Sequence, residues 1–137
     1  MFEVIYYSMC GSAKKVAEAI AEELGIKAEN VKRKKKPTKD SFLFLGSGCY
    51  GRKPGKKMQE FIARNNFEGR KIAIFGTSAD GEGNEVRAIG ELLKAKGALI
   101  RGNFYCKGRA LFFFNRGHPS KEDLTGARQF ASEMKKL

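Results

Sequence analysis

Three cysteines and one histidine are the residues of this sequence best suited to nucleophilic or metal chemistry. The cysteines Cys10, Cys49 and Cys106 are odd in number and contain no Cys-x-x-Cys pair, so they fit neither a disulfide framework nor a zinc site. A cysteine phosphatase needs an arginine six positions after its nucleophilic cysteine. The corresponding positions hold Val16, Gly55 and Phe112, which excludes that enzyme class. His118, the single histidine, argues against a metal cluster or a histidine-based triad.

Small and polar residues gather in three short stretches, at 8–13, 46–51 and 76–83. The first stretch follows an apolar run, 2–7, that is typical of a strand buried on both faces. Beyond it, apolar residues recur at helical spacing from Val16 onward. A strand that turns directly into a helix points free backbone N–H groups and the helix dipole at one place, most often a phosphate site. An ordinary strand–helix turn without a ligand is the alternative, and it stays open here.

The second stretch fits neither of two nucleotide-binding motifs. Gly46, Gly48 and Gly51 match Gly-x-Gly-x-x-Gly, but that fingerprint belongs to the first strand–helix turn and opens a helix at once. Here Arg52 and two further residues intervene, and the strand is third in order. A P-loop needs Lys and then Ser or Thr after its last glycine, and Arg52-Lys53 stands there instead.

Apolar runs alternate with helical patterns along the whole chain. We expect strands at 2–7, 28–31, 42–45, 72–75 and 98–100, the last with a continuation at 103–106. We expect helices from 13 to Leu24, from Pro54 to Ile62, from Val86 to Gly97, and from Pro119 to Met134, the last with Ser120 as N-cap and Asp123 in a capping box. Repeated strand–helix units predict an α/β fold, a parallel sheet with helices on both faces. Its ligands bind at the carboxyl ends of the strands, where the three stretches would meet.

The composition is typical of a cytoplasmic globular protein with one domain over residues 1–137. No apolar run approaches a membrane span, and Glu3 without early basic residues argues against a signal peptide. With 27 Lys and Arg against 15 Asp and Glu, the formal charge is +12, which attracts anionic partners. Lysine-rich surfaces are also common in proteins from hot environments, so both explanations stay open. The basic run 32–36 either protects a sheet edge, which we favour, or docks an anionic partner.

Taken together, the three stretches resemble those of flavodoxin, over nearly the whole chain and at the length of the short-chain type. Ser8-Met9-Cys10-Gly11-Ser12-Ala13 stands in the place of the Ser/Thr-x-Thr-Gly-x-Thr loop that surrounds the FMN phosphate. Leu45-Gly46-Ser47-Gly48-Cys49-Tyr50-Gly51 is similar to the Leu-Gly-x-x-x-x-Gly stretch along the inner flavin edge. Phe75-Gly76-Thr77 through Gly83 is similar to the third flavin loop. The resemblance implies a doubly wound five-stranded parallel sheet with strand order 2-1-3-4-5.

The resemblance also implies which residues contact FMN. They are Ser8, Met9, Cys10, Gly11, Ser12, Ala13 and Lys14 in the first stretch, Ser47, Gly48, Cys49, Tyr50 and Gly51 in the second, and Thr77, Ser78, Ala79, Asp80 and Gly81 in the third. In the family, the peptide of the glycine at position 51 flips to bond the reduced flavin, and Tyr50 would lie beside the ring.

Several residues depart from the family pattern. Cys10 and Ala13 replace two hydroxyl groups of the phosphate loop, a loss that Lys14 and Lys15 would partly offset. Asp80 stands where an aromatic residue often stacks on the flavin. Arg52 stands where an acidic residue is common. From a place close to the ring, its charge would make the hydroquinone couple less negative.

We therefore expect an FMN-binding electron carrier rather than a catalyst with its own substrate. Its partners would be redox proteins with acidic docking surfaces, and it would act as a monomer without nucleic acid or membrane. The alternatives are a basic docking module with a degraded flavin site, and a flavin-dependent reductase that uses Cys10 and Cys49 as a redox pair.

Alternate side chains of an extended segment face opposite ways, so at least one of Phe112, Phe113 and Phe114 would cover the crevice or a partner, unless all three are buried under the final helix.

Overall fold

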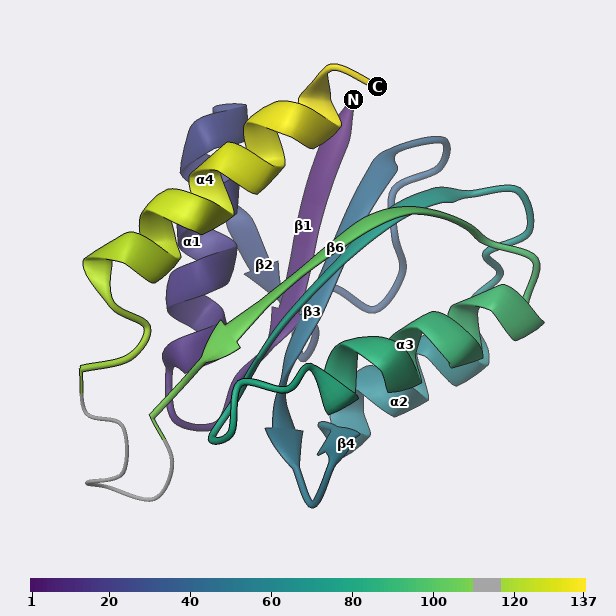
Figure 1. Ribbon diagram of the computed structural model, residues 1–137. Coiled ribbons are helices and arrows are strands. Elements are labelled where there is room, and N and C mark those ends of the chain that lie inside the picture. Colours follow the sequence, from purple (N-terminus) through teal and green to yellow (C-terminus); the bar gives the residue numbers. More distant parts are fainter. Residues whose placement is uncertain (110–116) are drawn as a thin grey trace.

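A computed structural model describes residues 1–109 and 117–137, and a parallel β-sheet forms its centre (Figure 1). The parallel strands are β1 (Phe2–Tyr7), β2 (Ala28–Asn30), β3 (Phe42–Tyr50), β5 (Lys71–Ser78) and β6 (Leu99–Lys107). They lie in the order β2-β1-β3-β5-β6, which confirms the predicted order of the five parallel strands. A short strand, β4 (Lys53–Pro54), pairs antiparallel with β3 and lies off this path.

Four helices cover the sheet in two layers. They are α1 (Ser12–Leu24), α2 (Lys56–Arg64), α3 (Asn84–Ala95) and α4 (Lys121–Lys135). Figure 1 shows α1 and α4 together on one face of the sheet and α2 and α3 on the other. This confirms the predicted doubly wound arrangement. Within residues 1–109 and 117–137, the structure contains no helix with the length and apolar character that a membrane span requires.

Strand β1 illustrates why the central strands are continuous apolar runs. Val4 and Tyr6 belong to the core cluster beneath α1 and α4, whereas Ile5 belongs to the cluster beneath α2 and α3. Successive side chains of a strand point to opposite faces of the sheet. Because helices cover both faces here, both sets of side chains are apolar and buried.

Two strands extend into stretches that their small residues predicted to be loops. β3 continues to Tyr50 instead of ending at Leu45, and β5 continues to Ser78 instead of ending at Phe75. Gly46 pairs with Phe75 in the ladder between these strands, and the ring of Phe75 occupies the space that a Cβ atom at Gly46 would need. Small residues here therefore allow close packing between strands.

A tight hairpin replaces the helix start predicted at Pro54. Gly51 and Arg52 both have a positive φ, 63° and 67°, as in the two-residue turns that join antiparallel strands. Across this hairpin Cys49 pairs with Pro54, and α2 begins only at Lys56. Proline is tolerated in β4 because an edge strand does not need every backbone N–H group for pairing.

The last strand is continuous, whereas the sequence predicted a segment at 98–100 and a continuation at 103–106. β6 contains a bulge that keeps it in the sheet: Ile72 pairs with Ile100, but the next residue, Ala73, pairs with Gly102. Arg101 is thus the additional residue on β6, as expected of a β-bulge.

Two predicted helix ends are confirmed. Gly25 follows α1 in the left-handed conformation, with φ of 71°. Ser120 and Asp123 form a reciprocal capping box at the start of α4. The predictions for Phe112, Phe113 and Phe114 lie outside the described residues.

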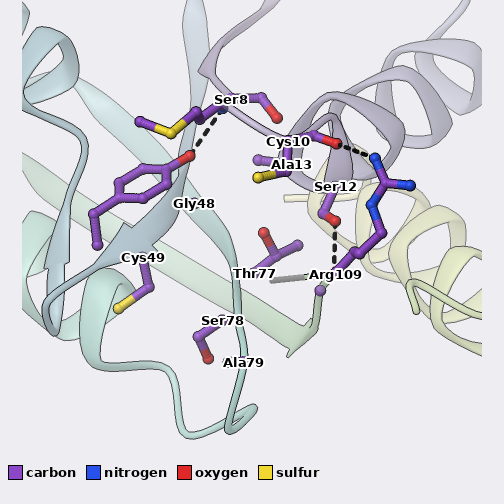
Figure 2. Close-up of a pocket in the computed structure, with 13 residues that line it drawn as sticks. Ser8, Cys10, Ser12, Ala13, Gly48, Cys49, Thr77, Ser78, Ala79 and Arg109 are labelled. Atoms are coloured by element: carbon purple, nitrogen blue, oxygen red, sulfur yellow. Dashed lines mark hydrogen bonds between the residues drawn. The ribbon is translucent and has the colours of Figure 1, made fainter. Parts of the chain in front are cut away.

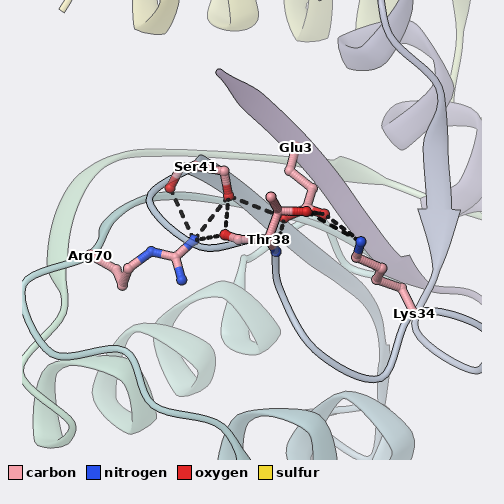
Figure 3. Close-up of polar contacts among 5 residues, drawn as sticks. All are labelled: Glu3, Lys34, Thr38, Ser41 and Arg70. Atoms are coloured by element: carbon pink, nitrogen blue, oxygen red, sulfur yellow. Dashed lines mark hydrogen bonds and ion pairs between the residues drawn. The ribbon is translucent and has the colours of Figure 1, made fainter.

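A buried carboxylate ties the basic run to the sheet (Figure 3). Glu3 accepts hydrogen bonds from the backbone N–H of Thr38 at 2.8 Å, from the Thr38 hydroxyl at 2.8 Å and from the Ser41 hydroxyl at 3.1 Å, and Lys34 Nζ lies 3.2 Å from it. Arg70 Nη2 donates to the carbonyls of Thr38 and Ser41, at 3.0 Å each. Burial alone would raise the pKa of Glu3, but the bonds from Thr38, Lys34 and Ser41 together hold this pKa below its usual value. Lys34 therefore has a structural partner within the fold.

Candidate functional site

A pocket of about 560 Å³ lies at the carboxyl ends of the parallel strands (Figure 2). It is lined by Ser8, Met9, Cys10, Ser12, Ala13, Gly48, Cys49, Tyr50, Thr77, Ser78, Ala79, Gly108 and Arg109. Members of all three predicted stretches thus meet at one place, and the end of β6 adds a fourth segment. The volume is within the range of small-molecule and cofactor sites, about 300–1,000 Å³.

One end of the pocket is formed by the start of α1. Gly11 is the N-cap residue, with φ of 91°, and no side chain caps this helix end among the described residues. The backbone N–H groups of the first turn therefore remain available to an anion, and the helix dipole favours negative charge there. Ser8 Oγ accepts a hydrogen bond from the backbone N–H of Gly11 at 3.0 Å. Ser12 Oγ accepts one from the backbone N–H of Arg109 at 2.9 Å.

Gly108 and Arg109 belong to the pocket although the sequence analysis did not select them. Arg109 Nη2 donates to the carbonyl of Cys10 at 3.3 Å, which places a cation against the first loop. A Cβ atom at Gly108 would lie 2.9 Å from the Cβ atoms of both Ser12 and Thr77, so a glycine is needed where β6 meets this loop. Their position directly after the fifth parallel strand was the available signal, since ligands gather at that edge.

Tyr50 connects the second stretch to the first. Its hydroxyl accepts a hydrogen bond from the backbone N–H of Met9 at 2.9 Å, and its ring packs edge-on against Tyr7 with the centroids 5.9 Å apart. A side chain at Gly48 would overlap the hydroxyl of Tyr50. Burial, as the largest cause, raises the pKa of Tyr50 to about 12, so the phenol is neutral. Tyr50 therefore forms a fixed, uncharged wall of the pocket.

The third stretch contributes Thr77, Ser78 and Ala79 to the pocket beside the second stretch, since Thr77 pairs with Gly48 in the sheet (Figure 2). Asp80 bonds within its own loop: Oδ1 accepts from the Ser78 hydroxyl at 3.0 Å and from the backbone N–H of Glu82 at 2.9 Å. The backbone bond from Glu82, followed by the bond from Ser78, lowers the pKa of Asp80. Asp80 thus holds the loop in shape and does not line the pocket.

Six of the residues predicted to contact FMN are absent from the pocket wall. They are Gly11, Lys14, Ser47, Gly51, Asp80 and Gly81. Ser47 is fully buried, and its hydroxyl donates to the carbonyl of Gly48 and accepts from the backbone N–H of Gly55, both at 2.8 Å. Gly51 lies in the hairpin turn beside Arg52. These two residues shape β3 and its hairpin.

The cysteines are free, and Cys10 and Cys49 line the pocket. Burial, followed by the charge of Glu85, raises the pKa of Cys49. Burial raises the pKa of Cys106 to about 12. Both thiols are therefore held protonated, which disfavours a thiolate mechanism. In the described part of the chain, no three His, Cys, Asp or Glu side chains are grouped so that they could hold a metal ion.

Comparison with known proteins gives matches in sequence and in structure. No protein-family model matches the chain. It is 26% identical over 136 residues to the uncharacterized protein MJ0298 of Methanocaldococcus jannaschii, a match that covers 91% of each chain.

Among solved structures, the chain superimposes on Flavodoxin 2 from Bacillus cereus with a TM-score of 0.78 and 18% identity, over 99% of each chain. A flavodoxin from the domain Archaea gives a TM-score of 0.75 and 19% identity, over 96% of this chain and 94% of that one. The flavodiiron protein from Giardia intestinalis gives a TM-score of 0.71 and 14% identity, over 96% of this chain and 34% of that one. At these identities the likeness concerns the fold, and it agrees with the strand order and with the three loops at one sheet edge. The chain therefore has the flavodoxin-like fold that its loop motifs predicted.

Proposed function

We propose that this protein binds FMN in the pocket at the carboxyl edge of the sheet and carries electrons between redox proteins. The observation that carries the proposal is the division of this pocket into two chemically different ends. The uncapped start of α1 and Arg109 form a cationic end, and Gly48, Cys49 and Tyr50 line the rest of the pocket together with Thr77–Ala79 of the neighbouring strand end. A phosphate attached to a flat aromatic ring system has the matching chemistry.

The donors at the first loop fit a phosphate group. Ser8 Oγ and Ser12 Oγ each accept a backbone N–H, which leaves the hydroxyl hydrogen of each free to donate to a further acceptor. A phosphate offers only acceptor oxygens at its ionised positions, so two hydroxyls and the first-turn N–H groups of α1 are complementary to it. Arg109 adds a positive charge at the position where Cys10 and Ala13 lack the family hydroxyls.

The walls of the pocket favour electron transfer over acid–base chemistry. The phenol of Tyr50 and the thiol of Cys49 stay protonated, so neither is prepared as a base or nucleophile. Bound FMN would supply the redox chemistry, while the protein supplies its position and its electrostatic surroundings. Met9, 67% exposed, lies at the pocket and offers an apolar contact for a partner.

The charge of the protein favours redox partners with acidic docking surfaces. The net charge is +12, and Lys32, the first residue of the basic run, lies over the ring of Tyr7 at 5.7 Å from its centroid. Tyr7 in turn packs against Tyr50, so the basic run begins close to the pocket. Surface charges of this kind act mainly on the rate of association and on the orientation of a partner. We expect the protein to work as a monomer.

A second candidate function is a basic docking module that has lost its flavin. The replacement of two phosphate-loop hydroxyls by Cys10 and Ala13 favours it, because each hydrogen bond to a charged group contributes about 1.5–3 kcal/mol. In that case the positive surface would remain functional while the pocket would not bind FMN.

Titration of the apoprotein with FMN, followed by quenching of flavin fluorescence, separates the two functions. We expect saturable quenching by FMN and much weaker quenching by riboflavin, which lacks the phosphate. Ser12→Asp should abolish FMN binding, because it places a carboxylate against the phosphate, whereas Ser12→Ala should only weaken it. Absence of quenching by high micromolar FMN would favour the docking module.

A further inference from the structure

Glu85 is a carboxylic acid buried where the proposed electron-transfer function does not require one. It lies in the first turn of α3 and is 0% exposed. Neither carboxyl oxygen has a hydrogen-bond partner of ordinary geometry among the described residues. The carboxyl group lies directly against the backbone of Gly76 in β5, where even a Cβ atom would overlap it. An ionised carboxylate in such a place is strongly disfavoured.

The surroundings of Glu85 connect it to the pocket. Gly76 directly precedes Thr77 and Ser78, and Cys49 lies close enough to the carboxyl group for the two groups to shift each other's pKa. Cys49, Thr77 and Ser78 line the pocket. Glu85 therefore lies just behind the wall, outside the pocket itself.

Four titratable or charged groups act on Glu85 or respond to it. They are Cys49 in β3, Asp80 in the loop after β5, Arg87 in α3 and Cys106 in β6. Burial raises the pKa of Glu85 most strongly, and Asp80 adds to this effect. The backbone N–H of Glu85 itself, Cys49 and Arg87 act in the opposite direction. After burial, the charge of Glu85 is the next cause that raises the pKa of Cys49, a residue of the pocket wall.

A permanently buried, unpartnered acid contributes nothing to folding that an apolar side chain would not provide better. A titratable group near a site with changing charge can, however, compensate that change, because it can take up a proton when the charge of the site becomes more negative.

We propose that Glu85, at pH values where its carboxyl group is ionised while the pocket is oxidised, takes up a proton from solvent when the pocket gains an electron and releases it when the electron leaves. The proposal rests on the proposed function, because the electron comes from an external reductant and is held by bound FMN. One electron that enters the pocket adds one negative charge, and the one proton that Glu85 can take up converts its carboxylate to the neutral acid, so the local charge is unchanged for that single-electron step. Glu85 acts through the electric field and is a positioning residue that does not touch the cofactor.

The first experiment measures how the reduction potential of the FMN-loaded protein depends on pH, in the wild type and in Glu85→Gln. We expect the potential of the wild type to fall more steeply with rising pH than that of Glu85→Gln. The two potentials should therefore differ most at high pH. Glu82→Gln removes an exposed carboxylate of the preceding loop and is the matched control, which should follow the wild type. Equal slopes in the wild type and Glu85→Gln would overturn the proposal.

The second experiment needs no flavin. The alkylation rate of Cys49 in the apoprotein, resolved from that of Cys10 and Cys106 by peptide mass spectrometry, reports the charge felt at the pocket wall. Removal of the Glu85 charge should lower the thiol pKa and speed alkylation on the order of threefold to tenfold at mildly alkaline pH. Glu85→Met tests the same effect with an apolar side chain if Glu85→Gln folds poorly.

Superimposable alkylation profiles in these variants would overturn the inference even if FMN binds. A shifted profile in a protein that binds no FMN would instead refute the proposed function, and it would support the electrostatic link between Glu85 and the pocket.

Discussion

Replacement of Arg109 by glutamine should weaken the binding of FMN but not that of riboflavin. The guanidinium lies against the first loop, with Nη2 at 3.3 Å from the carbonyl of Cys10, and it is the cationic side chain on the pocket wall. The hydrogen bond from the backbone N–H of Arg109 to Ser12 Oγ does not depend on the side chain, so the loop should keep its shape.

The size of this effect follows from the exposure of Arg109. Unit charges at about 4 Å interact by about 4 kcal/mol with an effective dielectric constant near 20, before screening. Exposed ion pairs retain only about 0.2–1 kcal/mol, and hydrogen bonds to charged groups about 1.5–3 kcal/mol. Arg109 is exposed yet anchored to the loop, so we expect a loss of about 1–2 kcal/mol, which is roughly a 5- to 30-fold increase in Kd.

Fluorescence titrations of the wild type and Arg109→Gln with FMN and riboflavin, at low and high salt, measure this effect. The difference in FMN affinity should shrink at high salt, because salt shortens the range of charge interactions. Arg128→Gln removes the same charge from α4, where Arg128 pairs with Glu22 at 3.5 Å, and should leave both affinities unchanged. Equal losses for FMN and riboflavin in Arg109→Gln, or no loss at all, would show that Arg109 does not face the phosphate.

Three further predictions concern the scaffold around the pocket. Glu3→Gln should lower the free energy of unfolding by about 1–3 kcal/mol at neutral pH, because the bonds from Thr38 and Ser41 lose a charged acceptor. The pKa of Glu3 is lower in the folded state, so this difference should be present above its usual pKa of 4.5 and disappear in urea titrations as pH falls through the folded-state pKa. Arg52→Asn should raise the free energy of unfolding by up to about 1 kcal/mol, since asparagine tolerates the positive φ of the hairpin turn better, while Lys53→Asn in β4 should not. Gly48→Ala should displace the ring of Tyr50, lower stability by about 1–3 kcal/mol and reduce FMN quenching. Gly117→Ala, where no atom of residues 1–109 and 117–137 would lie within 4 Å of the added Cβ, should be neutral in both assays.

Much of the fold could be predicted from local patterns. The continuous apolar runs of β1 and β3 indicate strands covered on both faces, and the spacing of apolar residues in α1 indicates a helix that packs on one side. Repeated strand–helix units then restrict the sheet to parallel order and bring the ends of the strands to one edge. For this reason members of all three stretches meet in the pocket, and the resemblance of the loops to flavodoxin agrees with the structural comparison.

Other features arise only when distant segments meet. The backbone N–H of Arg109 donates to Ser12, 97 positions earlier in the chain, and local sequence patterns do not predict a contact at such a separation. Pro54 looks like a helix start in isolation, but pairing with Cys49 makes it part of a hairpin. Glu85 resembles a solvent-exposed acid of a first helical turn until β5 covers it at Gly76. Residue types and spacing determine which face of an element is apolar, whereas the partner of a polar side chain depends on which backbone the tertiary fold places beside it.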